Sequence, residues 1–182
     1  MIKKILDAKD NKLRKVSKPV KVIDKKILSL IKDLKDTLSA QKDPEGIGLA
    51  ASQIGVSLRV FIMKPSDSIK VVINPQLNKN INSDETRKSK SKLTNISKQK
   101  NIMEGCLSLP HFYSPIERAK KIKIRYLDID GNIREETFKG LDAQIVQHEI
   151  DHLDGLLFID RILEQKKPLY EYVDGEWEKV EL

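Results

Sequence analysis

The chain has 182 residues, of which 39% are hydrophobic and 34% charged, and this fits one globular domain with a real core. No apolar run approaches the roughly 20 residues that cross a bilayer, and the charged N-terminus MIKKILDAKD lacks the apolar segment of a signal peptide. The single cysteine, Cys106, excludes an intramolecular disulfide and suits a reducing compartment. We therefore expect a cytoplasmic protein with no membrane partner.

The N-terminal part contains one strong helix signal. Residues 1–23 show no clear periodicity, and then Asp24 occupies the position of an N-cap. Apolar residues recur after it at spacings of three and four, which predicts an amphipathic helix over about 25–41. Its predicted buried stripe comprises Ile27, Leu28, Ile31, Leu34 and Leu38.

The next stretch, GIGLAASQIG from Gly46 to Gly55, is unusually rich in small residues. Two glycines and two alanines before Gln53 leave the backbone bare, which is typical of a tightly packed strand or turn, or of a place where a substrate approaches closely. Gln53 is of interest because a neutral amide can donate a hydrogen bond to a developing oxyanion without bringing a charge that must be desolvated.

Two short β-branched runs follow, at 59–64 and 70–74, and they predict a strand pair whose second strand stops at Pro75. The stretch 78–100 then holds seven basic and two acidic residues, so it carries +5 of the net charge of +7 and leaves +2 for the rest. It is rich in Lys, Ser and Asn, which predicts a surface insertion. The balanced remainder gives no reason to expect DNA binding.

EGCLSLP, from Glu104 to Pro110, leads into the second half of the chain. If it forms a strand, alternation places Cys106 and Ser108 on one face. The runs 121–127 and 133–138 flank Asp130-Gly131 and predict a β-hairpin. The end of the chain, 169–182, is predicted to be a short acidic tail with Trp177 as its one large anchor.

QHEIDHLDG, from Gln147 to Gly155, carries the chemistry. On an α-helix, residues four apart lie within about 40° of each other, so His148 and His152 share a face on which they can bind one metal ion. Glu149 between them can act on water at that ion. The chain has three histidines and two of them fall here. Apolar neighbours predict a buried side for the helix: Leu141, Ile145, Ile150, Leu153 and Leu157.

The three stretches GIGLAASQ, EGCLS and QHEIDHLDG, in this order, closely resemble the GxGLAAxQ, EGCxS and QHExDHxxG signatures of the peptide deformylase family. The similarity runs from about residue 3 to about 165. It implies an α+β fold of short, mostly antiparallel strands around a central helix that carries HExxH. The chain 1–182 would be one catalytic domain with an insertion at about 78–100 and a tail at about 169–182.

The resemblance also implies roles for individual residues. Cys106, His148 and His152 would bind one divalent metal, and Glu149 would be the general acid/base. Gln53 and the backbone N–H of Leu107 would be the oxyanion donors. The methionine pocket would be lined by Ile47, Gly48, Leu141 and Ile145. Glu104 and Arg118 would form a supporting ion pair.

The implied reaction is hydrolysis of the N-formyl group from the N-terminal formylmethionine of newly made polypeptides, with release of formate. In the family the metal is usually Fe²⁺, with Zn²⁺, Ni²⁺ or Co²⁺ as replacements. One thiolate and two imidazoles suit iron and zinc alike, so the residues themselves leave the metal open. The implied partner is the N-formylmethionyl nascent polypeptide, and we assume a monomer.

Two positions and the C-terminal tail depart from the family pattern. Tyr113 stands where many relatives place an arginine that contacts the substrate backbone, and Gln144 puts an amide where the pocket-lining helix is often apolar. Some relatives dock on the ribosome through a basic C-terminal helix, whereas this tail is acidic. Our hypothesis is that the basic stretch 78–100 contacts ribosomal RNA instead, which co-sedimentation with ribosomes before and after deletion of 79–100 would test.

Two other kinds of protein share parts of this pattern. An HExxH peptidase would need a third ligand downstream, for which Glu164 and Glu171 are the candidates. A structural zinc protein would close the metal shell with a fourth ligand, and His111, five residues after Cys106, is the candidate. The peptidase leaves EGCLS and Gln53 without a role, and the structural site would catalyse nothing.

Overall fold

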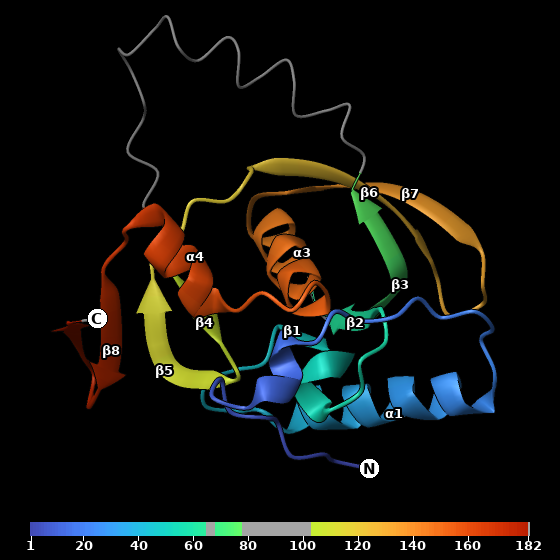
Figure 1. The fold of residues 1–182 in the computed structure, drawn as a ribbon, viewed down its shortest axis with the longest axis horizontal. Coiled ribbons are helices and arrows are strands. Elements are labelled where there is room, and N and C mark those ends of the chain that lie inside the picture. Colours follow the sequence, from blue (N-terminus) through green and yellow to red (C-terminus); the bar gives the residue numbers. More distant parts are fainter. Residues whose placement is uncertain (65–67, 78–102, 182) are drawn as a thin grey trace, which may run out of the picture.

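The computed structural model describes residues 1–64, 68–77 and 103–181, so the basic stretch 78–100, and with it the hypothesis of an RNA contact, falls outside the described residues. Two antiparallel sheets flank one central helix (Figure 1). The helices are η1 (Asn11–Arg14), α1 (Lys25–Ala40), η2 (Ala51–Ile54), α3 (Gly140–Leu153) and α4 (Phe158–Gln165). The strands are β1 (Gly48–Ala50), β2 (Val60–Met63), β3 (Lys70–Leu77), β4 (Glu104–Cys106), β5 (Leu109–Ser114), β6 (Lys121–Leu127), β7 (Ile133–Lys139), β8 (Leu169–Val173) and β9 (Glu176–Val180).

The larger sheet has the order β1-β2-β3-β6-β7 and the smaller one β4-β5-β8-β9. All pairings within both sheets are antiparallel. Helix α3 lies between the sheets and packs its apolar side chains against the concave face of the larger one (Figure 1). The predicted α+β class and the central position of the histidine helix are confirmed.

Helix α1 begins where the sequence predicts. The Asp24 carboxylate accepts hydrogen bonds from the backbone N–H groups of Lys26 and Ile27, at 2.9 and 3.0 Å, and so satisfies two donors that the first turn leaves free. One residue of the predicted apolar stripe was wrong: Leu28 is 44% exposed, whereas Leu30 is buried. The helix covers β1 and β2, and its buried side forms a core with residues such as Leu49 and Ile62.

Strand β3 continues through Pro75, so the prediction that this proline ends the strand was wrong. Strand β2 pairs with β3 only as far as Ile73, and the pairing of β3 with β6 shifts register between Ile73 and Gln76. The residues between them, Asn74 and Pro75, therefore lie in an irregularity of the ladder, where a missing N–H is tolerated. Asn74 has a positive φ of 51° and hydrogen-bonds the Val20 backbone through its side-chain amide.

The hairpin β6–β7 forms as predicted, in continuous register from Lys121↔Lys139 to Leu127↔Ile133. Its inner face carries alternate apolar side chains, among them Ile124 and Phe138, which pack with Val146 and Leu153 of α3. This packing fixes how the central helix is rotated. None of the described helices is long and apolar enough to cross a membrane.

The C-terminal stretch is more ordered than the sequence predicts. Strands β8 and β9 form a second hairpin that adds to β5 through the pairs Phe112↔Glu171 and Tyr113↔Tyr170. Trp177 in β9, the predicted anchor, packs against Tyr113 and Tyr172 but is 51% exposed. The segment 169–180 is therefore an integral part of the smaller sheet and comes close to the pocket described below.

Candidate active site

Helix α3 brings His148, Glu149 and His152 into the middle of the molecule. All three are buried, and the two imidazole rings lie edge to face with centroids 4.9 Å apart. Polar side chains at such depth need partners, because burying an unpaired polar group costs free energy. Their surroundings therefore show what each one can bind.

Cys106 joins the histidines from the end of β4. Its Sγ lies 3.2 Å from His152 Nε2, and one ligand atom from each of Cys106, His148 and His152 lies within 4.8 Å of the others. Among the described residues this is the group that could hold a metal ion. His111, Glu164 and Glu171 are not part of it, so neither alternative ligand set assembles here.

The loop after β4 does not follow strand alternation. Leu107 and Ser108 form a turn, and Cys106 already pairs with Leu109 across it. Cys106 and Ser108 nevertheless point the same way, because both accept hydrogen bonds from the Gln53 amide, at 3.7 Å for Sγ and 3.2 Å for Oγ. The predicted common direction was right, although a turn and not a strand produces it.

Gln53 is held in one orientation. Its Oε1 accepts a hydrogen bond of 2.9 Å from the Ala50 N–H, so its Nε2 is directed at Cys106 and Ser108. The residue is buried in η2, directly after the small-residue strand β1. A donor fixed in this way can aim at a developing negative charge beside the cysteine without reorganising.

Glu149 sits against the backbone of β1. A Cβ at Gly48 would lie 2.4 Å from Glu149 Oε1, so any side chain there would displace this carboxylate from its position. Among the described residues, Glu149 Oε2 is buried with no hydrogen-bond partner. Burial raises the pKa of Glu149 to about 7, although the neighbouring histidines act to lower it. The surroundings of this carboxyl group therefore bring its pKa close to neutral pH.

The three candidate ligands fit a divalent cation. His148 uses Nδ1 for a contact of 2.8 Å with Glu104, which leaves Nε2 for a metal. Burial alone would raise the pKa of the Cys106 thiol, but the two histidines overcome it and hold the pKa well below its ordinary value. A thiolate with two imidazoles is a donor set that zinc and ferrous iron accept, and three protein ligands leave a further position open.

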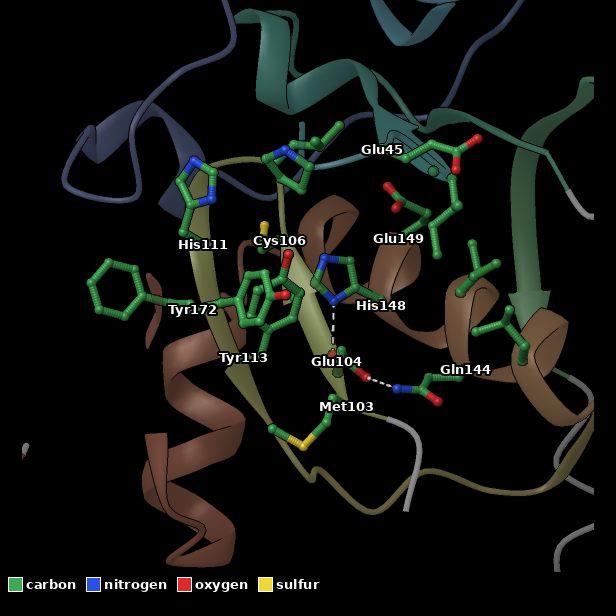
Figure 2. Close-up of a pocket in the computed structure, with 18 of the residues that line it drawn as sticks. Glu45, Met103, Glu104, Cys106, His111, Tyr113, Gln144, His148, Glu149 and Tyr172 are labelled. Carbon is green, nitrogen blue, oxygen red and sulfur yellow. Dashed lines mark hydrogen bonds and ion pairs between the residues drawn. The ribbon is translucent and has the colours of Figure 1, made fainter. Parts of the chain in front are cut away.

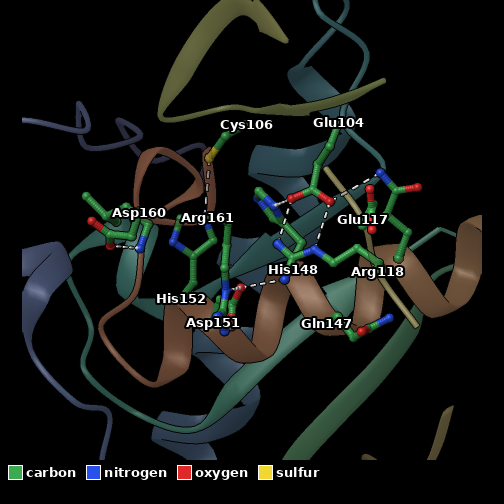
Figure 3. Close-up of polar contacts among 12 residues, drawn as sticks. Glu104, Cys106, Glu117, Arg118, Gln147, His148, Asp151, His152, Asp160 and Arg161 are labelled. Atoms are coloured by element: carbon green, nitrogen blue, oxygen red, sulfur yellow. Dashed lines mark hydrogen bonds and ion pairs between the residues drawn. The ribbon is translucent and has the colours of Figure 1, made fainter. Parts of the chain in front are cut away.

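A buried ionic network contacts the ligand His148 through Glu104 (Figure 3). Arg118 donates two hydrogen bonds to Glu104, of 2.7 and 3.0 Å, and a third of 2.6 Å to Asp151. Asp151 in turn accepts two from Arg161, of 2.6 and 2.9 Å. Burial alone would raise the pKa of Glu104, but His148 and Arg118 hold it at about 2. Glu104 is therefore a permanent anion facing His148.

The structure brings together Glu104 and Arg118 as predicted, and it adds residues that sequence reasoning missed. Gln144, noted only as a departure, donates a hydrogen bond of 3.2 Å to Glu104. Asp151 lies inside the stretch QHEIDHLDG, and Arg161 follows six residues after its end, so the motif itself was a signal for Asp151. These two residues carry opposite charges, so they could have been predicted to form an ion pair.

A cavity of about 320 Å³ opens beside the ligand group (Figure 2). The four residues predicted to line a side-chain pocket all line it, namely Ile47, Gly48, Leu141 and Ile145. Gln53, Leu107, Cys106, His148 and Glu149 also face it. Two of the three candidate ligands, Cys106 and His148, and the buried carboxylate are thus open to a small molecule or to the end of a chain.

The fold and the site together define a protein with a three-ligand metal site beside a buried carboxylate at the base of a cavity. A sequence model described as polypeptide deformylase matches residues 2–168. A peptide deformylase of Pseudothermotoga lettingae is 44% identical over 163 residues, which span 89% of this chain and 84% of that relative.

Solved structures agree with this. A peptide deformylase from Thermotoga maritima superposes with a TM-score of 0.72 and 34% identity, covering 88% of this chain and 97% of that one. The Met-Ala-Ser-bound enzyme of Acinetobacter baumannii gives 0.71 and 28%, covering 89% and 99%. The chain belongs to the polypeptide deformylase family, and the resemblance inferred from three motifs is confirmed.

The network predicts a large stability effect at Arg118. Replacing Arg118 by methionine leaves Glu104 and Asp151 buried without their shared partner, so the free energy of unfolding should fall by about 3–5 kcal/mol. Arg134, which pairs with Asp128 but is 57% exposed, is the matched control, and Arg134→Met should cost at most about 1 kcal/mol. Urea unfolding of the metal-free proteins measures both. Equal, small losses would contradict the account.

Proposed function

We propose that this chain is a metal-dependent peptide deformylase that removes the N-formyl group from the N-terminal formylmethionine of newly made polypeptides and releases formate. The observation that carries the proposal is the grouping of Cys106, His148 and His152 beside a cavity that is lined by Cys106 and His148 together with Glu149 and Gln53. Membership of the deformylase family supports the reaction and the class of substrate.

In this proposal Cys106, His148 and His152 hold one divalent ion. When bound, the ion supplies Lewis acidity that makes water a competent nucleophile near neutral pH. Glu104 accepts the Nδ1 proton of His148 in a hydrogen bond and so presents its other nitrogen to the ion. We propose Fe²⁺ in the cell, with Zn²⁺, Ni²⁺ or Co²⁺ as replacements, because the donor set accepts all of them.

Glu149 moves the proton. Water adds to the formyl carbon while the Glu149 carboxylate takes its proton, and the same group then protonates the amine as the C–N bond breaks. Formate and a free N-terminal methionine result. Burial raises the pKa of Glu149 to about 7, and a cation held beside it would favour the ionised form that accepts the proton.

Gln53 and the Leu107 backbone N–H stabilise the negative charge that develops on the formyl oxygen. Gln53 is suited to this because its amide is locked by Ala50 and directed at the ligand cysteine. Removing one such donor typically lowers the rate about 100- to 1000-fold. Ile47, Gly48, Leu141 and Ile145 would hold the methionine side chain, since they line the cavity with apolar surface from the start of β1 and from α3.

We further propose that residues 1–182 act as one catalytic domain in the cytoplasm, where newly made formylated chains are its substrate. Ribosome association and a monomeric state remain predictions. Both concern surfaces beyond the cavity, and neither is needed for the reaction.

The direct test is formate release from formyl-Met-Ala-Ser by protein purified without oxygen and loaded with Fe²⁺ or Ni²⁺. Glu149→Gln should lower the rate by about 100- to 10,000-fold, because proton transfer loses its carrier, while one metal ion per chain is retained. Glu164→Gln is the matched control, since Glu164 is exposed and pairs with Arg161, and it should behave like the wild type. No formate from metal-loaded wild type would refute the function.

Crowding Glu149 should have a similar effect without altering any ionisable group. In Gly48→Ala the new methyl group collides with the Glu149 carboxylate, so we expect kcat to fall at least about tenfold with full metal content. Gly46→Ala is the control, because its methyl group would meet the side chain of Leu38 at 2.6 Å instead. It should lower the midpoint of thermal unfolding and leave kcat unchanged. The opposite pattern would show that Gly48 serves only packing.

A further inference from the structure

Helix α3 places one amide side chain within the proposed methionine pocket. One face of the helix lines the cavity with residues at helical spacing, namely Leu141, Gln144, Ile145 and His148. Gln144 is only 9% exposed, and it lies one turn before the candidate metal ligand His148. It is also the direct neighbour of two residues proposed to hold the methionine side chain. A first side chain that enters this pocket therefore meets a buried amide.

The amide is held in one orientation. Gln144 Nε2 donates a hydrogen bond of 3.2 Å to Glu104 Oε2 (Figure 2). The reverse orientation would turn the amide oxygen toward a carboxylate, and both groups can only accept hydrogen bonds. Arg118 fixes this carboxylate with two hydrogen bonds of 2.7 and 3.0 Å. The donor and the acceptor of Gln144 thus have defined positions in the pocket.

Part of the hydrogen-bonding capacity of Gln144 is free. Its Nε2 carries a second N–H and its Oε1 is an acceptor, and neither has a further partner among the described residues. A first side chain that covers the amide with methylene groups leaves both unpaired, which weakens binding. The thioether of methionine relieves this little, because its sulfur is a weak acceptor. A stronger acceptor at the same place would suit the free N–H better.

We propose, resting on the deformylase function above, that Gln144 adapts the methionine pocket to formylmethionine sulfoxide, so that the enzyme also deformylates chains whose first residue has been oxidised. Oxidation turns the thioether into a polar and chiral group. In one epimer the sulfoxide oxygen accepts the free N–H of Gln144, whereas in the other it faces the apolar side chains of Leu141 and Ile145. Hydrolysis adds water across the formyl C–N bond and leaves the sulfoxide unchanged.

The test compares formyl-Met-Ala-Ser with its two sulfoxide epimers. For the wild type we expect one epimer to have a kcat/KM within about tenfold of the methionine peptide. The other should be at least about tenfold poorer than the first, because its oxygen is buried without a donor. Each ratio uses a single enzyme preparation, so it does not depend on the fraction of folded protein. Equal values for the two epimers, or two epimers both more than about tenfold below the methionine peptide, would overturn the proposal.

A variant assigns the preference to Gln144. Gln144→Met removes the amide at nearly constant length, and Glu104 keeps three hydrogen bonds from Arg118 and His148, so the variant should fold. We expect kcat/KM of the favoured epimer, relative to the methionine peptide, to fall about tenfold and the epimers to become alike. Gln147→Met is the matched control, because Gln147 bonds the loop before β6 and does not line the cavity. It should keep the wild-type ratios. Unchanged ratios in Gln144→Met would refute the role of Gln144.

A binding measurement separates this proposal from the deformylase function. Unformylated Met-Ala-Ser and its two sulfoxide epimers are titrated into the zinc-loaded protein by calorimetry. A difference in affinity between the epimers that Gln144→Met abolishes supports the proposal even if no formate is released from any substrate. Equal affinities of the epimers, with normal formate release from formyl-Met-Ala-Ser, would refute the role of Gln144 and leave the function intact.

Discussion

The site depends on one buried carboxylate, that of Glu104. Its two oxygens are shared by Arg118, His148 and Gln144, which come from a loop and from two turns of α3. Each contact alone would be unfavourable to bury, because an isolated charge in the interior is costly. Together they tie β4 to α3, and β4 ends in Cys106. The distance between the cysteine and the two histidines is therefore set by this carboxylate.

A comparison of two glutamates shows how the surroundings divide the chemistry. Glu104 and Glu149 are both buried beside His148, yet the pKa of Glu104 is held at about 2 and that of Glu149 is raised to about 7. The difference lies in partners, because Arg118 donates twice to Glu104, whereas Glu149 Oε2 has none among the described residues. One carboxylate is a fixed anion that orients a ligand. The other is available to carry a proton.

The ligand group was predictable because helical spacing alone places His148 and His152 on one face, and the motif order adds Cys106. Features that depend on tertiary contacts could not be predicted from the sequence. Strand β3 continues through Pro75 because neighbouring strands leave that position unpaired, and Ser108 faces Gln53 because of a turn. The hairpin β8–β9 exists because β5 offers it an edge. The sequences of such short, polar strands have no periodicity that distinguishes them from an irregular tail.

The central claim is that one thiolate and two imidazoles hold the metal, and X-ray absorption spectroscopy of the zinc-loaded protein tests it most directly. We expect one sulfur neighbour at about 2.3 Å and two imidazole nitrogens at about 2.0–2.1 Å, with the remaining coordination supplied by a light atom. Cys106→Ser should lose the sulfur signal. A shell without sulfur, or one with a third imidazole that disappears in His111→Ala, would contradict the account and restore the closed structural site.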